Sequence, residues 1–152
     1  MHVVFFAKGV PKGQPRPRAF ARQMGGKMVA RVYESGTAEG WKSAVAEAAK
    51  PYLPKAPMQG PIECNITFYF PRPQSHYGKR KGELYLKPDA PQWHAQKPDV
   101  DNAIKALMDA LTTLGMWMDD AQVVSMLVSK KYSETIGVTG ATIEIENIAT
   151  GG

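Results

Sequence analysis

A strictly alternating stretch from Ile62 to Phe70 constrains the fold more than any other part of the sequence. Its apolar positions are Ile62, Cys64, Ile66, Phe68 and Phe70, and its intervening positions are Glu63, Asn65, Thr67 and Tyr69. A period of two is that of a β-strand, so the segment predicts a strand with one face on a hydrophobic core. The same pattern makes Cys64 a small buried apolar residue and not a nucleophile.

A helical pattern occupies Asp101 to Leu114. Its apolar stripe is formed by Ile104, Leu107, Met108, Leu111 and Leu114, and Gly115 follows as a typical helix terminator. A first helix is predicted to run to Lys50 from a cap at Ser35 or Thr37, with Trp41, Ala44, Val45 and Ala48 at helical spacing. The sequence therefore predicts two helices that pack on a sheet.

The remaining strands are predicted from short apolar runs and their turns. The expected strands are Val3–Ala7, a hairpin of Ala19–Gln23 and Met28–Tyr33 around Gly25-Gly26, a strand begun at Met116, and two final strands at Val123–Lys131 and Ala141–Ile148. Residues 71–97 show no sustained periodicity and are expected to form a long functional or disordered loop. The expected fold is α/β, of the α+β kind: a small mixed sheet with two helices, in one domain at 1–148, with a flexible tail at 149–152.

Composition excludes several classes of protein and adds a charge asymmetry. Cys64 is the only cysteine, so one chain has neither a disulfide framework nor a thiolate metal cage. No segment approaches membrane-spanning length and no leader pattern is present, so a soluble, cytoplasmic protein is expected. Residues 1–98 hold 16 Lys and Arg against 6 Asp and Glu, whereas residues 99–152 hold 3 against 8. A basic surface beside an acidic cluster favours a polyanion and divalent cations.

The acidic cluster consists of Asp99, Asp101, Asp119 and Asp120, with Lys105 between them. The structural alternative is that Asp101 is a plain helix cap and Asp99 favours the helix dipole. The helix spans about 20 Å and five extended residues return only about 17 Å, so Asp120 reaches the Asp101 end if the chain turns back sharply. Adjacent residues of a strand point to opposite faces, so at most one of Asp119 and Asp120 belongs to such a site.

Converging carboxylates repel one another and need a cation to hold them together. Oxygen ligands alone select a hard ion, so the cluster predicts a Mg²⁺ site, in which Mn²⁺ is expected to substitute. Lys105 stays protonated beside carboxylates and is expected to position a water or neutralise charge on a phosphate. Asp109, two turns further along the helix, is interpreted as solvated or salt-bridged.

The stretch Lys97-Pro98-Asp99-Val100-Asp101-Asn102-Ala103-Ile104-Lys105-Ala106-Leu107-Met108-Asp109-Ala110-Leu111, followed by Gly115-Met116-Trp117-Met118-Asp119-Asp120-Ala121-Gln122-Val123, resembles the RusA family of Holliday-junction resolvases. The resemblance implies a small α/β homodimer that binds four-way DNA junctions and nicks two opposed strands with magnesium, in DNA recombination and repair. It implies that Asp99, Asp101 and Asp120 are the essential acidic residues, that Lys105 is the catalytic lysine, and that Asp119 is a less critical neighbour and a further candidate ligand. Pro15-Arg16-Pro17-Arg18 is similar to the family's basic N-terminal loop.

The basic residues Arg16, Arg18, Lys79, Arg80, Lys81 and Lys97 are expected to contact DNA phosphates collectively. Trp93 is expected either to stack on bases at the junction centre or to be buried as a loop anchor. His94 is interpreted as a hydrogen-bonding loop residue. The competing hypotheses are a nuclease for flaps or forks and a non-catalytic junction-binding protein, in which the aspartates are caps. A small-molecule phosphohydrolase fits poorly, since no glycine-rich phosphate loop adjoins the site. No membrane partner and no small-molecule cofactor are expected.

Overall fold

A four-stranded mixed sheet forms the centre of the computed structural model, which describes residues 1–14, 17–24, 27–34 and 38–148. Its order is β1 (His2–Lys8), β8 (Gly140–Asn147), β4 (Ile62–Phe70) and β7 (Val123–Tyr132). β8 pairs antiparallel with both β1 and β4, whereas β7 runs parallel to β4. The mixed α+β fold predicted from the sequence is therefore confirmed.

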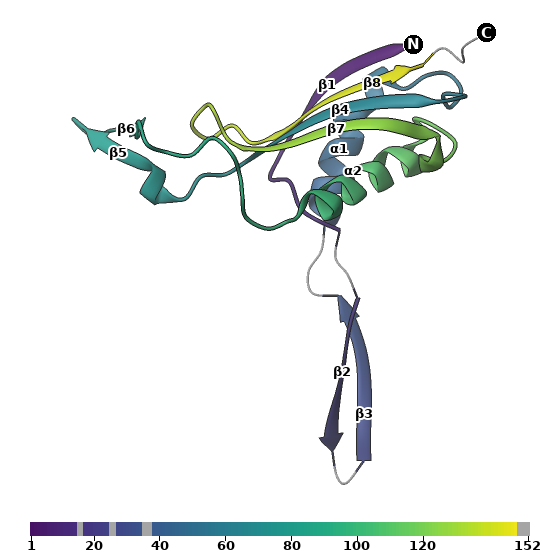
Figure 1. Cartoon of the computed structure of the whole chain (residues 1–152), viewed down its shortest axis with the longest axis horizontal. Helices are drawn as coiled ribbons and strands as arrows, with labels where there is room; N and C mark the ends of the chain where they lie inside the picture. The colour runs from purple at the N-terminus through teal and green to yellow at the C-terminus, as the bar shows by residue number, and fades with distance from the viewer. Residues whose placement is uncertain (15–16, 25–26, 35–37, 149–152) are drawn as a thin grey trace.

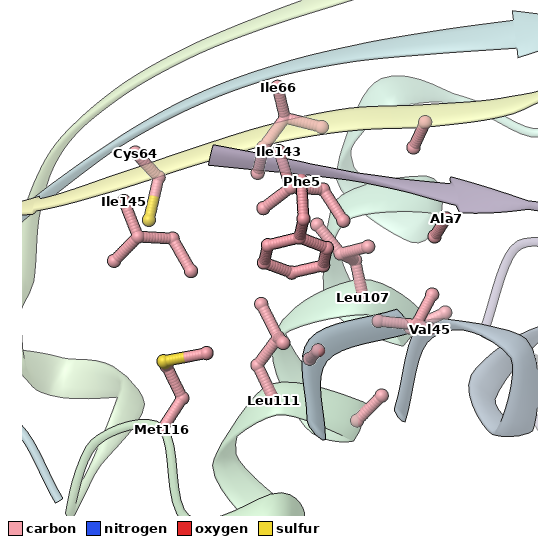
Figure 2. Close-up of a cluster of buried hydrophobic side chains, with 14 of the residues drawn as sticks. Phe5, Ala7, Val45, Cys64, Ile66, Leu107, Leu111, Met116, Ile143 and Ile145 are labelled. Atoms are coloured by element: carbon pink, nitrogen blue, oxygen red, sulfur yellow. The ribbon is translucent and has the colours of Figure 1, made fainter. Parts of the chain in front are cut away.

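Two helices, α1 (Glu39–Ala49) and α2 (Val100–Leu114), cover one face of this sheet, as Figure 1 shows. A short 3-10 turn, η1 (Lys50–Tyr52), follows α1. The core fills the space between sheet and helices. Figure 2 shows Phe5, Ile66 and Ile143 of the sheet facing Leu107 and Leu111 of α2. Among the described residues, no helix is long and apolar enough to cross a membrane.

The alternating pattern of β4 is confirmed, with the boundaries that the sequence predicts. All five of its apolar alternate residues are buried, because they face the two helices. Cys64 is among them and is 1% exposed. Burial, and to a lesser extent the charge of Glu63, raises the pKa of the Cys64 thiol to about 12. The thiolate is therefore scarce at neutral pH, as expected for a packing residue.

The helices differ from the sequence-based expectation in detail. α2 begins at Val100, and its fully buried face is formed by Ala103, Ala106, Leu107 and Leu111, because small residues let α1 and the sheet approach closely. Ile104, Met108 and Leu114 pack at the rim of this face. Gly115 ends α2 with φ of 94°, a left-handed conformation that favours glycine. α1 begins at Glu39 with Ala38 as its N-cap, whereas Ser35 and Thr37 lie outside the described residues.

Two hairpins stand apart from the four-stranded sheet. β2 (Pro17–Met24) pairs antiparallel with β3 (Lys27–Glu34), which confirms the predicted hairpin; its turn at Gly25-Gly26 is outside the described residues. Residues 71–97, expected to lack regular structure, contain a 3-10 turn, η2 (Gln74–His76), and a second hairpin of β5 (Tyr77–Arg80) and β6 (Glu83–Leu86). Its strands have four residues each, too short for a periodic pattern to mark them.

The segment after α2 is not the strand that was predicted from Met116. Trp117 forms an isolated bridge with Met58, and a 3-10 turn, η3 (Asp120–Gln122), follows. Only then does β7 begin, at Val123. Met116 and Trp117 are buried, so their apolar character reflects packing at the end of the core and not a strand period. The final residues, 149–152, lie outside the described part.

Candidate functional site

The start of α2 carries the first two candidate carboxylates. Asp99 is the N-cap residue of α2, and Asp101 is the second residue of the helix. Asp99 follows a cis peptide bond between Lys97 and Pro98. Both aspartates are exposed, and the Asp99 side chain accepts no helix-capping hydrogen bond. The interpretation of Asp101 as the helix cap is therefore wrong, and the Asp99 carboxylate is not used for capping either.

Lys105 lies one turn after Asp101 and is exposed, as the spacing predicts. Asp109, one turn further, pairs with Lys42 of α1 at 3.1 Å between Nζ and Oδ2. This ion pair confirms the interpretation of Asp109 as salt-bridged. Asp109 therefore has a structural ion-pair partner on α1 and is not counted with Asp99 and Asp101 as a candidate ligand.

The second acidic pair lies in the turn before β7. The Asp119 carboxylate accepts a hydrogen bond from the Ala121 amide at 2.8 Å and caps η3. Gln122 completes this turn: its amide oxygen accepts from the amides of Met118 and Asp119, at 2.8 and 3.0 Å. Its amide nitrogen donates to the carbonyls of Met58 and Gly60. Asp119 is thus occupied by a structural role, whereas Gln122 fixes the turn to the rest of the chain.

Asp120 is exposed, and its carboxylate makes no hydrogen bond or ion pair with the part of the chain that the structure describes. The capping box is formed by Asp119 and Gln122. Of the two adjacent aspartates, Asp120 is therefore the one whose side chain is available to a ligand.

The two acidic pairs do not converge within one chain. Lys130 of β7 lies beside the start of α2, where its Nζ donates to the carbonyl of Gln96 at 2.6 Å. The end of α2 lies beside the segment that leads into β4, where the Met58 amide donates to the Met116 carbonyl. Because β4 and β7 are parallel, this is also the end at which β7 starts. α2 therefore runs opposite to β7, and Asp99 and Asp120 lie at opposite ends of this helix, which is about 20 Å long. The expectation that Asp120 returns to the Asp101 end of its own helix is wrong, because η3 and β7 start at the far end.

A shallow surface hollow of about 490 Å³ adjoins Asp99. It is lined by Ala95, Gln96, Lys97, Asp99, Val100 and Lys130. Burial lowers the pKa of Lys130, and the negative charge of Asp99 opposes that effect. Lys130 was not predicted from the sequence as a residue of this site. The available signal was its position on the same strand face as Met126 and Val128, where a lysine is unexpected unless it has a local role.

Trp93 and His94, which are adjacent in the loop before α2, have different environments. Trp93 is 58% exposed, with the Lys131 ammonium 5.3 Å from its ring centre, so the interpretation as a buried anchor is wrong. His94 is buried and stacks on Phe70 with ring centres 3.9 Å apart. Burial, and then the charge of Lys130, lowers the pKa of His94, so this ring is neutral at neutral pH. His94 packs the loop against the end of the sheet, while its amide donates to the Lys130 carbonyl at 3.0 Å.

The other basic residues expected to contact DNA lie in separate segments. Lys79, Arg80 and Lys81 are exposed on the β5–β6 hairpin. Arg18 lies in β2, opposite Tyr33 in the strand register, although its side chain is outside the described part of the structure. Arg16 also lies outside the described residues. One chain therefore presents Lys97 next to Asp99 and the hairpin lysines at a separate location.

The segment between β1 and β2 packs on the start of α2, a contact that sequence reasoning missed. The Gln14 amide donates to the Asn102 carbonyl at 3.0 Å. A Cβ atom added at Gly13 would lie 2.8 Å from Cβ of Pro98 and 3.3 Å from Cβ of Asn102. Gly13 is therefore the residue that allows this segment to approach the helix start that carries Asp99 and Asp101.

Replacing Gly13 with alanine is expected to destabilise the protein by about 1–3 kcal/mol, because the new methyl group overlaps a proline ring that cannot move aside. Thermal unfolding should then occur about 3–10 °C lower. Gly40→Ala is the matched control, since nothing lies within 4 Å of the added Cβ and alanine favours the helix. A Gly13→Ala variant that unfolds together with the wild-type protein would contradict the close contact.

Comparisons with known proteins match most of the chain. The family model of the endodeoxyribonuclease RusA matches residues 8–146, which include both acidic pairs, Lys105 and the two hairpins. The chain is also 36% identical over 137 residues to the uncharacterized protein YqaN of Bacillus subtilis (strain 168), a match that covers 87% of this chain and 89% of YqaN. The similarity thus extends over the fold as a whole and not only over the acidic motif.

Proposed function

Because the chain belongs to the RusA family of endodeoxyribonucleases, we propose that it is a magnesium-dependent endonuclease that resolves four-way DNA junctions by nicking two opposed strands. The observation that carries the proposal is the pair Asp99 and Asp101 at the start of α2. Asp99 is exposed and its side chain makes no capping hydrogen bond, so its carboxylate oxygens are not engaged by the amides at the start of α2. A carboxylate left in this position is suited to a cation.

The donor chemistry fits magnesium, since Asp99, Asp101 and Asp120 offer carboxylate oxygens only. One chain does not assemble them: the described residues contain no group of three side chains able to hold a metal ion together. We therefore place Asp99 and Asp101 of one chain and Asp120 of a second chain in the same site. A divalent cation bound there would supply positive charge at the phosphate and a more acidic water.

The outer edge of β7 is where we place the second chain. β7 is an edge strand. Residues 92–94 cover its last part, because the His94 amide donates to the Lys130 carbonyl and the Tyr132 amide to the Gln92 carbonyl. From Val123 to Ser129, this edge pairs with no other strand in the described part of the chain, and Val124 and Leu127 are each 63% exposed. An unpaired edge of this kind is a template for another strand.

Antiparallel pairing of two β7 edges about a two-fold axis would cover the unpaired edge. It would also bring Asp120 of one chain to Asp99 and Asp101 of the other. The start of one β7, next to Asp120, would lie beside the end of the other, next to Lys130 and Asp99. The strand follows an acidic turn and carries Lys130 and Lys131 near its end, so this arrangement sets opposite charges against each other. A symmetric dimer also presents two sites to two opposed strands.

The remaining residues have roles that follow from their positions. Lys105 lies one turn from Asp101, and its exposed ammonium forms no ion pair within the described residues. It is therefore suited to neutralise negative charge on the phosphate that is cut. Lys97 and Lys130 line the hollow beside Asp99 and are suited to the neighbouring phosphates. Lysine side chains thus lie next to the candidate carboxylates, where the DNA backbone would bind.

Cleavage of a synthetic mobile four-way junction tests the proposal. Purified protein is expected to release nicked duplexes with magnesium and none with a chelator, and to leave linear duplex of the same sequence intact. Flap and fork substrates belong in the same panel. Faster cutting of flaps or forks than of the junction would replace junction resolution with another branched-DNA activity. Junction binding without cleavage at any magnesium concentration would identify a non-catalytic binding protein.

A further inference from the structure

The β5–β6 hairpin is exposed on both of its faces. Residues 79–86 are all exposed, including three consecutive apolar side chains, Leu84 at 47%, Tyr85 at 39% and Leu86 at 39%. Neither strand contributes a residue to the hydrophobic core of the described chain. Exposed apolar residues that are contiguous and do not serve the core indicate a contact surface.

The β5–β6 hairpin has a regular two-residue turn and a hydrogen-bonded base. Its two-residue turn is Lys81-Gly82, with φ of 53° and 81°, and positive φ at both positions matches the twist of the two strands. At its base, the Lys87 amide donates to the His76 carbonyl at 3.0 Å. The direction in which the hairpin leaves the body is therefore fixed from both ends.

Arg72 anchors the hairpin to the end of the central sheet. Its guanidinium donates to the carbonyls of Ser133 and Pro91, at 2.8 and 2.6 Å, and contacts His76 Nδ1 at 3.2 Å. The same group lies over the Tyr132 ring, 5.3 Å from its centre. Tyr132 is the last residue of β7, and Lys130 beside it adjoins Asp99. The hairpin therefore extends from the end of the sheet that lies next to the start of α2, as Figure 1 shows.

Tyr85 is held in place on one face of the hairpin. It is paired with Gly78, and a Cβ atom there would lie 2.5 Å from Cζ and Oη of the tyrosine, so the ring lies across the glycine. Arg80, on the same face by strand register, has its guanidinium carbon 5.2 Å from the centre of the Tyr85 ring. An aromatic ring that is both exposed and pre-positioned loses little entropy when another flat group stacks on it.

The net positive charge of the hairpin favours a polyanionic ligand. Residues 77–87 carry Lys79, Arg80, Lys81 and Lys87 against Glu83 alone, a net charge of +3. A cationic element with a fixed aromatic ring is the combination that binds unpaired or splayed nucleobases next to phosphates. We propose that the β5–β6 hairpin is a DNA-contacting element, in which Tyr85 stacks on a base at the branch point, while Lys81 in the turn and Lys87 at the base hold the flanking phosphates. This inference rests on the proposed function.

The test measures binding without cleavage. Full-length protein is titrated, in the absence of divalent cations, into a four-way junction and a linear duplex that each carry 2-aminopurine, the junction at its branch point. Wild-type protein is expected to change the fluorescence of the junction. Tyr85→Ala should remove most of that change and weaken junction binding about tenfold, the loss typical of one stacked base. Tyr85→Phe keeps the ring and should behave as the wild type.

Three further variants separate the parts of the proposal. Gly78→Ala displaces the ring without removing it and should reduce the fluorescence change. Lys81→Ala with Lys87→Ala should weaken binding to junction and duplex alike, with the full fluorescence change at saturation. Leu84→Ala, an exposed apolar truncation on the opposite face, is the matched control and should change neither.

The possible failures are distinguishable. If Tyr85→Ala binds the junction with the wild-type affinity and fluorescence change, the hairpin does not contact the branch point, and its apolar surface serves a protein partner instead. Junction nicking by the wild type in the same preparation would show that the proposed function survives this result. If the wild-type protein neither binds nor nicks the junction, both proposals are overturned.

Discussion

Replacing Asp120 with asparagine is expected to abolish junction nicking while junction binding remains within about twofold of wild type. The physical reason is that the asparagine side chain keeps the shape of the aspartate but removes the charge that holds a cation against the phosphate. Loss of one such ligand removes several kcal/mol of transition-state stabilisation, which corresponds to at least about a hundredfold in rate. Nicking is measured under single-turnover conditions with magnesium, and binding is measured without it.

Asp119→Asn is the matched control for this substitution. Asp119 accepts the Ala121 amide and caps η3, a role that an asparagine oxygen also fills. We therefore expect Asp119→Asn to keep most of the nicking activity, although the two residues are adjacent and both are aspartates. Equal loss of activity in both variants would mean that the turn, and not the Asp120 carboxylate, is what the reaction needs. Loss of junction binding by a folded Asp120→Asn protein would overturn the assignment.

A heterodimer of two inactive chains is expected to regain nicking. One chain carries Asp99→Asn and the other Asp120→Asn, and the two are co-expressed with different affinity tags and purified as a pair. If each site takes Asp99 from one chain and Asp120 from its partner, both substitutions fall in the same site and the other site is wild type. The heterodimer should therefore nick single strands at about half the wild-type rate per dimer, and it should not make the paired nick.

The homodimers of the two variants, each with a substitution in both sites, provide the baseline. A heterodimer as inactive as they are would contradict the shared site, because sites built within one chain would each hold one substitution. Leu127→Lys offers a control on the interface: a charge at this exposed position of β7 should weaken dimer formation. In sedimentation, that variant should appear as monomer at concentrations where the wild type is a dimer.

The sequence by itself determined β4, the end of α2 and the spacing of the charged residues at the start of α2. The strict period of two at Ile62–Phe70 has one structural solution, and β4 has those boundaries. Gly115 ended α2 because a left-handed residue is needed there and glycine adopts it without strain. Asp99, Asp101 and Lys105 were placed correctly relative to one another, since residues within two helical turns have a spacing that the sequence alone specifies.

Only the tertiary structure decided what lies far apart in the chain. The direction of β7 follows from its parallel pairing with β4, a contact between residues more than fifty positions apart. That pairing sends Asp120 to the far end of α2 and brings Lys130 beside Asp99. The β5–β6 hairpin was missed because its strands are short and are defined by pairing and by the anchor at Arg72, which no local period reports. Local spacing fixes which groups share a helix turn, whereas sheet topology fixes which ends of the elements meet, and here it placed one carboxylate of the proposed site at the opposite end of the helix from the other two.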